Sequence, residues 1–331
     1  MTALDDASAT RLPWHLRGNY APVFEEVDAI DLAVQGRIPD DLCGRYFRNG
    51  ANPASGRSMH WFGGDGMLHG VRLRDGRAEW YRNRWVRTEA FAIEDAAGEA
   101  VWSGINERPD FRHPGGPFKD TANTDLVFHA GRLLALWWLG GPCYDVDVAT
   151  LDTKGRFDFH GSLASLSAHP KVDPRTGEMM VFDFGMVPPY LTYGVVGPDG
   201  TLTHHTDIEL AGPRLLHDIA ITEHHTILCD FPLMWDPEHL ARGRTKVMFD
   251  RDLPARFGII PRHGDGASVR LASNFDNLAF GERLIRLKYD ELLDLAGTEV
   301  MGGFEDHAGR SEQREQIRKS LLKVLPSDEN N

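Results

Sequence analysis

The chain of 331 residues carries 49 acidic and 36 basic side chains, which gives a formal net charge of −13 at pH 7. This balance argues against binding a nucleic-acid backbone, because phosphate recognition requires clustered lysine and arginine. Hydrophobic residues make up 41% of the chain, which is enough to fill the core of one large domain or two modest ones.

The cysteines and the N-terminal residues indicate a reduced, cytoplasmic protein. Cys43, Cys143 and Cys229 form an odd number and show no CxxC spacing, unlike a disulfide framework. The first residues lack the basic and apolar regions of a signal peptide, and no run of about 18 apolar residues occurs.

The first third of the chain predicts an N-terminal arm, then strands, then a long loop. Residues 1–40 are punctuated by prolines and predict the arm. Aromatic and β-branched residues then favour short strands at 46–48, 71–74 and 79–81, with a hairpin turn at Asp75-Gly76. Residues 95–121 are rich in glycine, proline and alanine and predict a long loop, a kind of segment that often serves function.

After this loop, hairpin signals recur at regular intervals. They are Ala130-Gly131, Lys154-Gly155, Thr176-Gly177 and Asp199-Gly200, with apolar segments on both sides. Two such hairpins make a four-stranded unit of about 46 residues, which is in the range of a propeller blade. The sequence therefore predicts an all-β fold of the β-propeller class.

Two histidines occupy similar settings at blade spacing. His169 comes just before a tight turn, and His217 follows it by 48 residues, also at the approach to an apolar strand. Positions one blade apart are related by rotation about the propeller axis, so both side chains would point at that axis and could hold a metal. The alternative is that each histidine ends a strand and is hydrogen-bonded within the core.

The β pattern does not continue to the C-terminus. Residues 284–295 and 310–324 show the spacing of amphipathic helices. We therefore divide the chain into an arm at 1–40, a partial propeller at 41–270 and a divergent, helical tail at 271–331.

Six segments, in this order, resemble the successive signatures of the carotenoid cleavage oxygenases. They are GRYFRNGANP at 44–53, HWFGGDGMLH at 60–69, RNRWVRT at 82–88, AHPKVDPRTGE at 168–178, HDIAIT at 217–222 and RFGIIPR at 256–262. The resemblance implies a seven-bladed propeller with Fe(II) on its axis, held by four histidines, of which His169 would be the first and His217 the second. It also implies a dioxygenase that uses O2 to cleave an alkene bond of a carotenoid, apocarotenoid or stilbene. Neutral imidazoles suit Fe(II).

The chain departs from the family pattern at several points. The strand expected to carry the third ligand and the segment expected to carry the fourth are not visible after Arg270, which suggests a truncated, spliced or frame-shifted member. Seven blades of about 46 residues would need about 320 residues before any long loops. The chain has 331 residues including its arm, loops and tail, so it is too short for seven blades. The glutamate that would orient a ligand histidine is expected after Trp137, where this chain has Trp138. His263 and His307 lie near blade spacing and are substitute candidates for the missing ligands.

Other segments allow weaker functional interpretations. His204-His205 and His224-His225 are adjacent on strands, so their side chains should point to opposite faces and not chelate a metal together. The apolar segment at 231–235 could line a substrate tunnel, make a peripheral membrane contact or pack in the core. Trp85 stands where a stilbene-cleaving enzyme should have a phenol-binding tyrosine, which favours an apocarotenoid-like substrate.

Two rival functions remain open at the sequence level. The missing ligands allow a non-catalytic propeller remnant that binds an apolar ligand or a protein. A metal-dependent hydrolase would require axial carboxylates, which do not appear at blade spacing. No phosphate-binding glycine loop, GxSxG or HExxH motif occurs.

Overall fold

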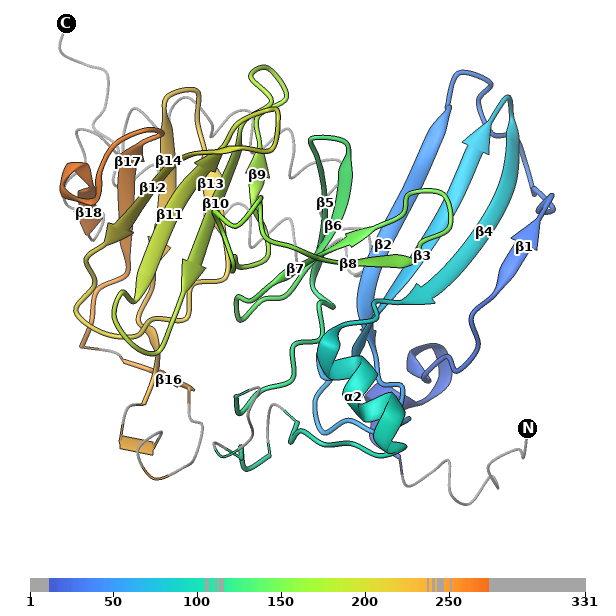
Figure 1. Ribbon diagram of the computed structural model, residues 1–331, viewed down its shortest axis with the longest axis horizontal. Helices are drawn as coiled ribbons and strands as arrows, with labels where there is room; N and C mark the ends of the chain where they lie inside the picture. The colour runs from blue at the N-terminus through green and yellow to red at the C-terminus, as the bar shows by residue number, and fades with distance from the viewer. Residues whose placement is uncertain are drawn as a thin grey trace, which may run out of the picture. The chain divides into compact units, whose positions relative to one another are not determined.

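In the computed structural model, the described part of the chain is residues 12–273, except 105–106, 111, 113–115, 237, 240–241, 243–246 and 251. Most of it forms four antiparallel sheets of four strands each, which we call the first to fourth blades (Figure 1). The first blade comprises β1 (Asp28–Ile30), β4 (Arg77–Trp85), β3 (Asp65–Arg74) and β2 (Gly44–Asn52), in that order. The second runs β5 (Asp125–His129), β6 (Arg132–Leu136), β7 (Cys143–Val146) and β8 (Thr153–Phe157).

The third and fourth blades continue the pattern. The third comprises β9 (Lys171–Val172), β10 (Met179–Phe184), β11 (Leu191–Val196) and β12 (Leu202–Ile208). The fourth has the order β13 (Ile219–Ile221), β14 (His225–Asp230), β17 (Arg256–Pro261) and β18 (Arg270–Ser273), with the hairpin of β15 (Leu233–Trp235) and β16 (Val247–Phe249) inserted between β14 and β17. Because β5, β9 and β13 begin 46 and 48 residues apart, the predicted blade length is confirmed.

Most of the predicted hairpin turns are confirmed, and one is wrong. Asp75-Gly76 and Ala130-Gly131 each connect two strands with positive φ at both residues, as a two-residue turn of the I′ type requires. Lys154-Gly155, in contrast, lies inside β8, where the register to β7 shifts between Asp145 and Val146. The Lys-Gly pair therefore marks a β-bulge, a feature that attracts glycine for the same reason as a turn.

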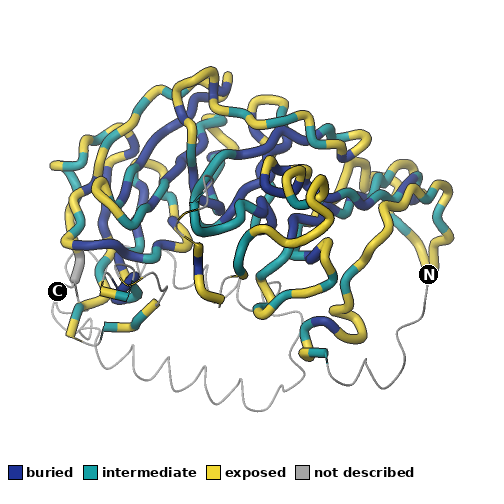
Figure 2. The backbone as a smooth tube through the Cα atoms, turned by 60° about the horizontal axis from the view of Figure 1, so that its bottom comes forward, coloured by how far each residue is buried: buried dark blue, intermediate teal, exposed yellow. Residues whose placement is uncertain are grey.

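The cores lie between neighbouring blades, because successive side chains of a strand point to opposite faces. On β6, Leu133 and Ala135 pack with Leu68 of the first blade, whereas Leu134 and Leu136 pack with Met179 of the third. The strand β10 repeats this division, since Met180 and Phe182 face the fourth blade together with Ile219 and Leu228. Burial accordingly follows the middle strands (Figure 2).

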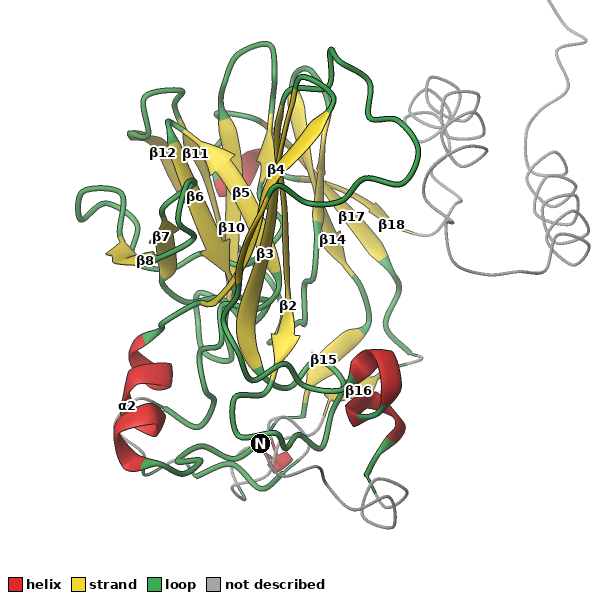
Figure 3. Ribbon diagram, turned by 90° about the vertical axis from the view of Figure 1, so that its right-hand side faces the viewer, coloured by secondary structure: helices red, strands yellow, loops and turns green. Residues whose placement is uncertain are grey.

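A helix that was not predicted follows the first blade. The helix α2 (Glu89–Ala97) follows the end of β4 (Figure 3), so the predicted long loop at 95–121 begins only after it. The Thr88 hydroxyl accepts a hydrogen bond from the Phe91 amide at the N-terminus, and Gly98 ends the helix in the left-handed conformation. Only Ala90 and Phe91 are buried, which explains why its hydrophobic periodicity is weak.

The predicted arm and tail are only partly described. The arm contains two short 3-10 helices, η1 (Trp14–Leu16) and η2 (Gly18–Tyr20), and the strand β1, which pairs with β4. A further 3-10 helix, η3 (Gly266–Ser268), precedes β18. The predicted helices of the tail lie outside the described residues. Within those residues, no helix has both the length and the apolar character to cross a membrane, and all three cysteines are free thiols.

Candidate metal centre

His169 is held in an unusual backbone conformation by a carboxylate from the second blade. Its φ is 66°, a left-handed value that residues other than glycine adopt only when their surroundings fix it. Asp125, the first residue of β5, provides this constraint through one oxygen. Its Oδ2 accepts a hydrogen bond from the His169 backbone amide at 3.0 Å and lies 3.3 Å from Nδ1 of the imidazole.

His217 lies just before β13 and is linked to His169 through a lysine. The ammonium group of Lys171, the first residue of β9, lies 2.5 Å from Oδ1 of Asp218 and donates to the His169 carbonyl at 3.1 Å. The same Asp218 oxygen accepts a hydrogen bond from the Ile219 amide at 2.7 Å. Lys171 therefore ties together the two segments that carry the histidines.

The structure brings the two imidazoles into contact. The ring centroids of His169 and His217 are 4.8 Å apart, with the ring planes at 70° to each other. Desolvation lowers the pKa of His217 below its ordinary value, and the neighbouring His169 lowers it further. His217 is therefore neutral at pH 7, the form whose nitrogen lone pair binds a metal. Two imidazoles at this separation fit two positions around Fe(II).

The described residues offer this pair no third ligand. Within the described ranges, no group of three or more histidine, cysteine, aspartate or glutamate side chains is arranged to hold a metal. His263 contacts Glu178, with Nε2 2.9 Å from Oε1, and its ring lies 6.0 Å from that of His204. His307 lies outside the described residues.

Trp138, which stands where the family glutamate was expected, cannot accept a hydrogen bond from an imidazole. Its indole Nε1 is buried and has no hydrogen-bond partner within the described part of the chain. Its backbone nonetheless supports the site, because its carbonyl accepts a hydrogen bond from Ser167 Oγ at 3.1 Å, two residues before His169.

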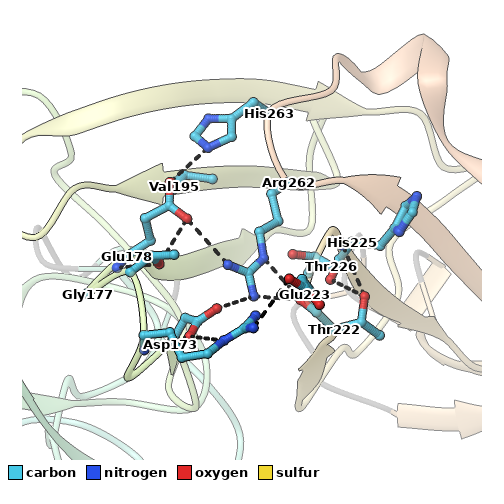
Figure 4. A network of polar contacts seen from close by, with 12 residues as sticks. Asp173, Gly177, Glu178, Val195, Thr222, Glu223, His225, Thr226, Arg262 and His263 are labelled. Atoms are coloured by element: carbon cyan, nitrogen blue, oxygen red, sulfur yellow. Dashed lines mark hydrogen bonds and ion pairs between the residues drawn. The ribbon is translucent and has the colours of Figure 1, made fainter. Parts of the chain in front are cut away.

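The turn that follows His169 is fixed by an arginine of the fourth blade (Figure 4). Arg262 is buried, and its guanidinium lies 2.7 Å from Asp173 Oδ2 and 3.3 Å from Glu178 Oε2. It also donates to the Thr222 carbonyl at 2.5 and 3.1 Å. At the other end of the same strand, Arg256 pairs with buried Asp230. Arg262 therefore links the third and fourth blades, whereas Arg256 pairs across to β14 within the fourth blade.

A cavity of about 680 Å³ is lined by residues of the arm, of the segments 53–65 and 94–121, and by Trp137. Its apolar lining includes Leu16, Met59, Phe62, Trp102, Phe118 and Trp137. Trp137 connects the cavity to the site, since its carbonyl accepts a hydrogen bond from the Ala168 amide at 3.0 Å. Lys119 also lines the cavity, but its ammonium group is paired with Asp65 at 2.5 Å and with Glu94. A volume of this size suits a small-molecule ligand.

Three residues of the site were not predicted from the sequence, namely Asp125, Lys171 and Asp218. The signal available for Asp125 was its position, 44 residues before His169 and thus about one blade earlier. Lys171 and Asp218 lie two residues and one residue after the histidines that were identified.

Comparison with known proteins identifies the relationship. The family model described as retinal pigment epithelial membrane protein matches residues 20–280. The chain belongs to this family, that of the carotenoid cleavage oxygenases. A carotenoid cleavage oxygenase of Mycobacterium tuberculosis is 44% identical over 300 residues, which cover 77% of this chain and 58% of the relative.

Solved structures of the carotenoid cleavage oxygenase family agree with the fold. The lignostilbene dioxygenase of Pseudomonas brassicacearum matches with a TM-score of 0.71 and 30% identity, over 78% of this chain and 55% of that protein. A cobalt-substituted apocarotenoid oxygenase of Synechocystis matches with a TM-score of 0.65 and 28% identity, over 76% and 57% of the two chains. The propeller prediction is confirmed, and the chain spans about half the length of the relatives it matches.

Proposed function

We propose that this chain is a non-haem Fe(II) oxygenase that cleaves a conjugated alkene bond of an apolar substrate with O2. The observation that carries the proposal is the contact between the His169 and His217 rings, at 4.8 Å, in a member of the carotenoid cleavage oxygenase family. The relatives are named as oxygenases, which gives no support to the non-catalytic alternative.

The residues of this chain would hold and orient the metal. Bound Fe(II) would supply the activation of O2. His169 and His217 would donate two nitrogens, Asp125 would orient the first imidazole, and the Lys171–Asp218 ion pair would set the separation of the two loops. The remaining ligands would come from outside the described residues, where the candidate His307 lies.

The cavity bounded by Trp137 would receive the substrate. Its apolar side chains would bury a polyene or aryl chain and exclude water, and the Trp137 backbone places its inner wall next to the His169 segment. We propose an apocarotenoid-like substrate, because Trp85 is buried and offers no phenol-binding hydroxyl.

An exposed aromatic cluster beside the cavity would provide a peripheral membrane contact for substrate uptake. The cluster consists of Trp14, Tyr20, Trp61 and Phe62, whose rings lie 5.0 to 5.7 Å apart and whose side chains are 45–61% exposed. Tryptophan and tyrosine favour the interface between lipid and water. The segment at 231–235 is less suitable, since Trp235 is buried and Phe231 packs against Phe257. We keep a cytoplasmic location as a proposal.

Metal analysis tests the proposed function. The chain is purified without oxygen, reconstituted with Fe(II) and assayed for bound iron and for O2-dependent loss of the absorbance of an apocarotenoid. We expect about one iron per chain. His169→Asn, which tolerates the left-handed backbone, and His217→Ala should abolish both iron binding and turnover. His205→Ala, on the exposed side of β12, is the control. A wild-type chain that retains no iron after reconstitution contradicts the proposal.

A further inference from the structure

We infer that Asp125 is a positioning residue that fixes both the orientation and the tautomer of His169 for metal binding. The inference rests on the proposed function, because it assigns His169 as a metal ligand.

The geometry of the carboxylate carries this inference. One oxygen of Asp125, Oδ2, lies within reach of both donors of His169, the backbone amide at 3.0 Å and Nδ1 at 3.3 Å. The two contacts close a ring that fixes the direction of the imidazole relative to its own backbone. A proton on Nδ1 is shared with the carboxylate, so Nε2 carries the lone pair and is free to bind a metal.

Asp125 is itself rigidly held. Its second oxygen, Oδ1, accepts a hydrogen bond from the Leu126 amide at 2.8 Å, so both oxygens act as acceptors. Its backbone pairs with Leu136 in β6, and its carbonyl lies 3.3 Å from the side-chain amide of Asn49 in β2. A carboxylate fixed by two blades can therefore fix a side chain of a third.

The positive φ of His169 is an independent observation that supports the same role for Asp125. Proline follows it, and the residue before proline is restricted to extended conformations, so φ of 66° is strained at this position. The bond from the His169 amide to Asp125 holds the backbone there. Asp125 therefore stabilises a conformation that the local sequence disfavours.

Asparagine at position 125 separates this role from simple packing. The side chains of aspartate and asparagine have the same shape, but asparagine has a single acceptor oxygen. Asp125→Asn can therefore satisfy either the Leu126 amide or the two donors of His169, and not both. Asp199→Asn is the matched control, because Asp199 Oδ1 accepts from the Thr201 amide in the exposed turn between β11 and β12, away from both histidines.

The first measurement is the affinity for cobalt(II), followed by visible absorption during anaerobic titration of the full chain. We expect Asp125→Asn to weaken Co(II) binding by 10- to 100-fold, the usual loss when a ligand histidine loses its carboxylate partner. Asp199→Asn should bind Co(II) like the wild type. Equal Co(II) affinities of wild type, Asp125→Asn and Asp125→Ala would overturn the inference, because alanine offers no side-chain acceptor to His169.

The second measurement distinguishes this inference from the proposed function. The tautomer of His169 is read from ¹⁵N chemical shifts of the metal-free, ¹⁵N-histidine-labelled chain, with the resonance assigned through His169→Asn. The inference expects a proton on Nδ1 in wild type and in Asp199→Asn, and a mixture or an Nε2 proton in Asp125→Asn. If wild type binds no metal but the tautomer changes as expected, the proposed function fails and the positioning role stands. An unchanged tautomer in both Asp125→Asn and Asp125→Ala, the second of which offers no side-chain acceptor, overturns the positioning role, whether or not metal binds.

Discussion

At the scale of single residues, Asp120 is a buried carboxylate that the proposed chemistry does not use. It lies in the segment that leads into β5, where its Oδ1 accepts a hydrogen bond from the Ala122 amide at 3.1 Å. Burial raises the pKa of Asp120 to about 6, and the Ala122 amide and the Tyr144 hydroxyl offset this only in part. Between about pH 4 and 6, Asp120 is therefore protonated in the folded chain and ionised in the unfolded chain.

This raised pKa predicts that Asp120→Asn stabilises the protein at high pH. The pKa of Asp120 is 3.8 in the unfolded chain. Its ionisation therefore lowers the free energy of unfolding progressively between about pH 4 and 6, and by a constant amount above that range. The variant should gain up to about 3 kcal/mol in the free energy of unfolding at pH 8, and about half of that at pH 5. Urea denaturation at the two pH values measures both gains.

Asp147→Asn is the control with the opposite sign. The pKa of Asp147 is lowered by hydrogen bonds from the Ala149 and Thr150 amides, so its charge favours folding above its unfolded pKa. This variant should lose stability at pH 8. An equal gain of Asp120→Asn at pH 5 and pH 8 would show that the effect is not due to ionisation.

The site could be predicted from the sequence only where spacing alone specifies it. His169 and His217 were identified because blade repetition places equivalent residues at equivalent points. Asp125 was not identified, because acidic residues are common in this chain and only the packing of β5 against the His169 segment shows which one makes contact. The pairing of Arg262 with Asp173 likewise depends on two blades meeting, and local sequence contains no signal for it.

At the scale of elements, the strand β17 is anchored at both ends by buried ion pairs. Arg256 and Arg214 share Asp230, and Arg262 lies between Asp173, Glu178 and the Thr222 carbonyl. The turn after His169 therefore depends on a residue of the next blade, which couples the geometry of the candidate site to the packing of β17.

Removal of Arg262 should destabilise the chain far more than removal of an exposed arginine. Arg262→Met removes the guanidinium that contacts Asp173, Glu178 and the Thr222 carbonyl, and should lower the free energy of unfolding by about 3 kcal/mol. Arg37→Met, whose side chain is 81% exposed and pairs with Asp40 at the surface, should cost about 1 kcal/mol or less. Thermal unfolding monitored by circular dichroism compares the two, and similar losses would contradict the structural role of Arg262.

Prediction of the elements succeeded where backbone requirements are local. Asp75-Gly76 and Ala130-Gly131 were recognised because turns of this type need positive φ at both residues. The turn predicted at Lys154-Gly155 was wrong, because a β-bulge accepts glycine as readily as a turn does. The helix α2 has good caps in Thr88 and Gly98, but it has too few buried residues for periodicity to reveal it.

At the scale of the molecule, the aromatic cluster and the cavity lie together at one surface of the described chain. Phe62 belongs to both, and Pro13 and Met59 line the cavity next to the cluster. An apolar substrate leaving a lipid surface would therefore meet the cavity without crossing water.

Binding to neutral vesicles tests this arrangement. The net charge of −13 disfavours anionic lipid, so we expect cosedimentation with phosphatidylcholine vesicles. The double variant Trp14→Ser and Trp61→Ser should weaken binding at least tenfold, which corresponds to about 1.4 kcal/mol of lost apolar burial. The matched double variant Phe128→Ser and Val187→Ser removes side chains that are 60% and 73% exposed elsewhere. Equal losses in the two double variants would contradict a specific contact surface.

The division of β6 and β10 between two cores has a consequence for how the chain tolerates change. Leu133 and Leu134 are neighbours in sequence but belong to different cores. A deletion of one residue in β6 would turn the side chains of each face of the strand to the opposite face and disturb both adjoining cores at once. A deletion in an exposed loop would disturb neither core. A mutation in one of these strands should therefore destabilise the packing against the blades on both sides. Insertions and deletions that are compatible with folding should be confined to the connections between strands.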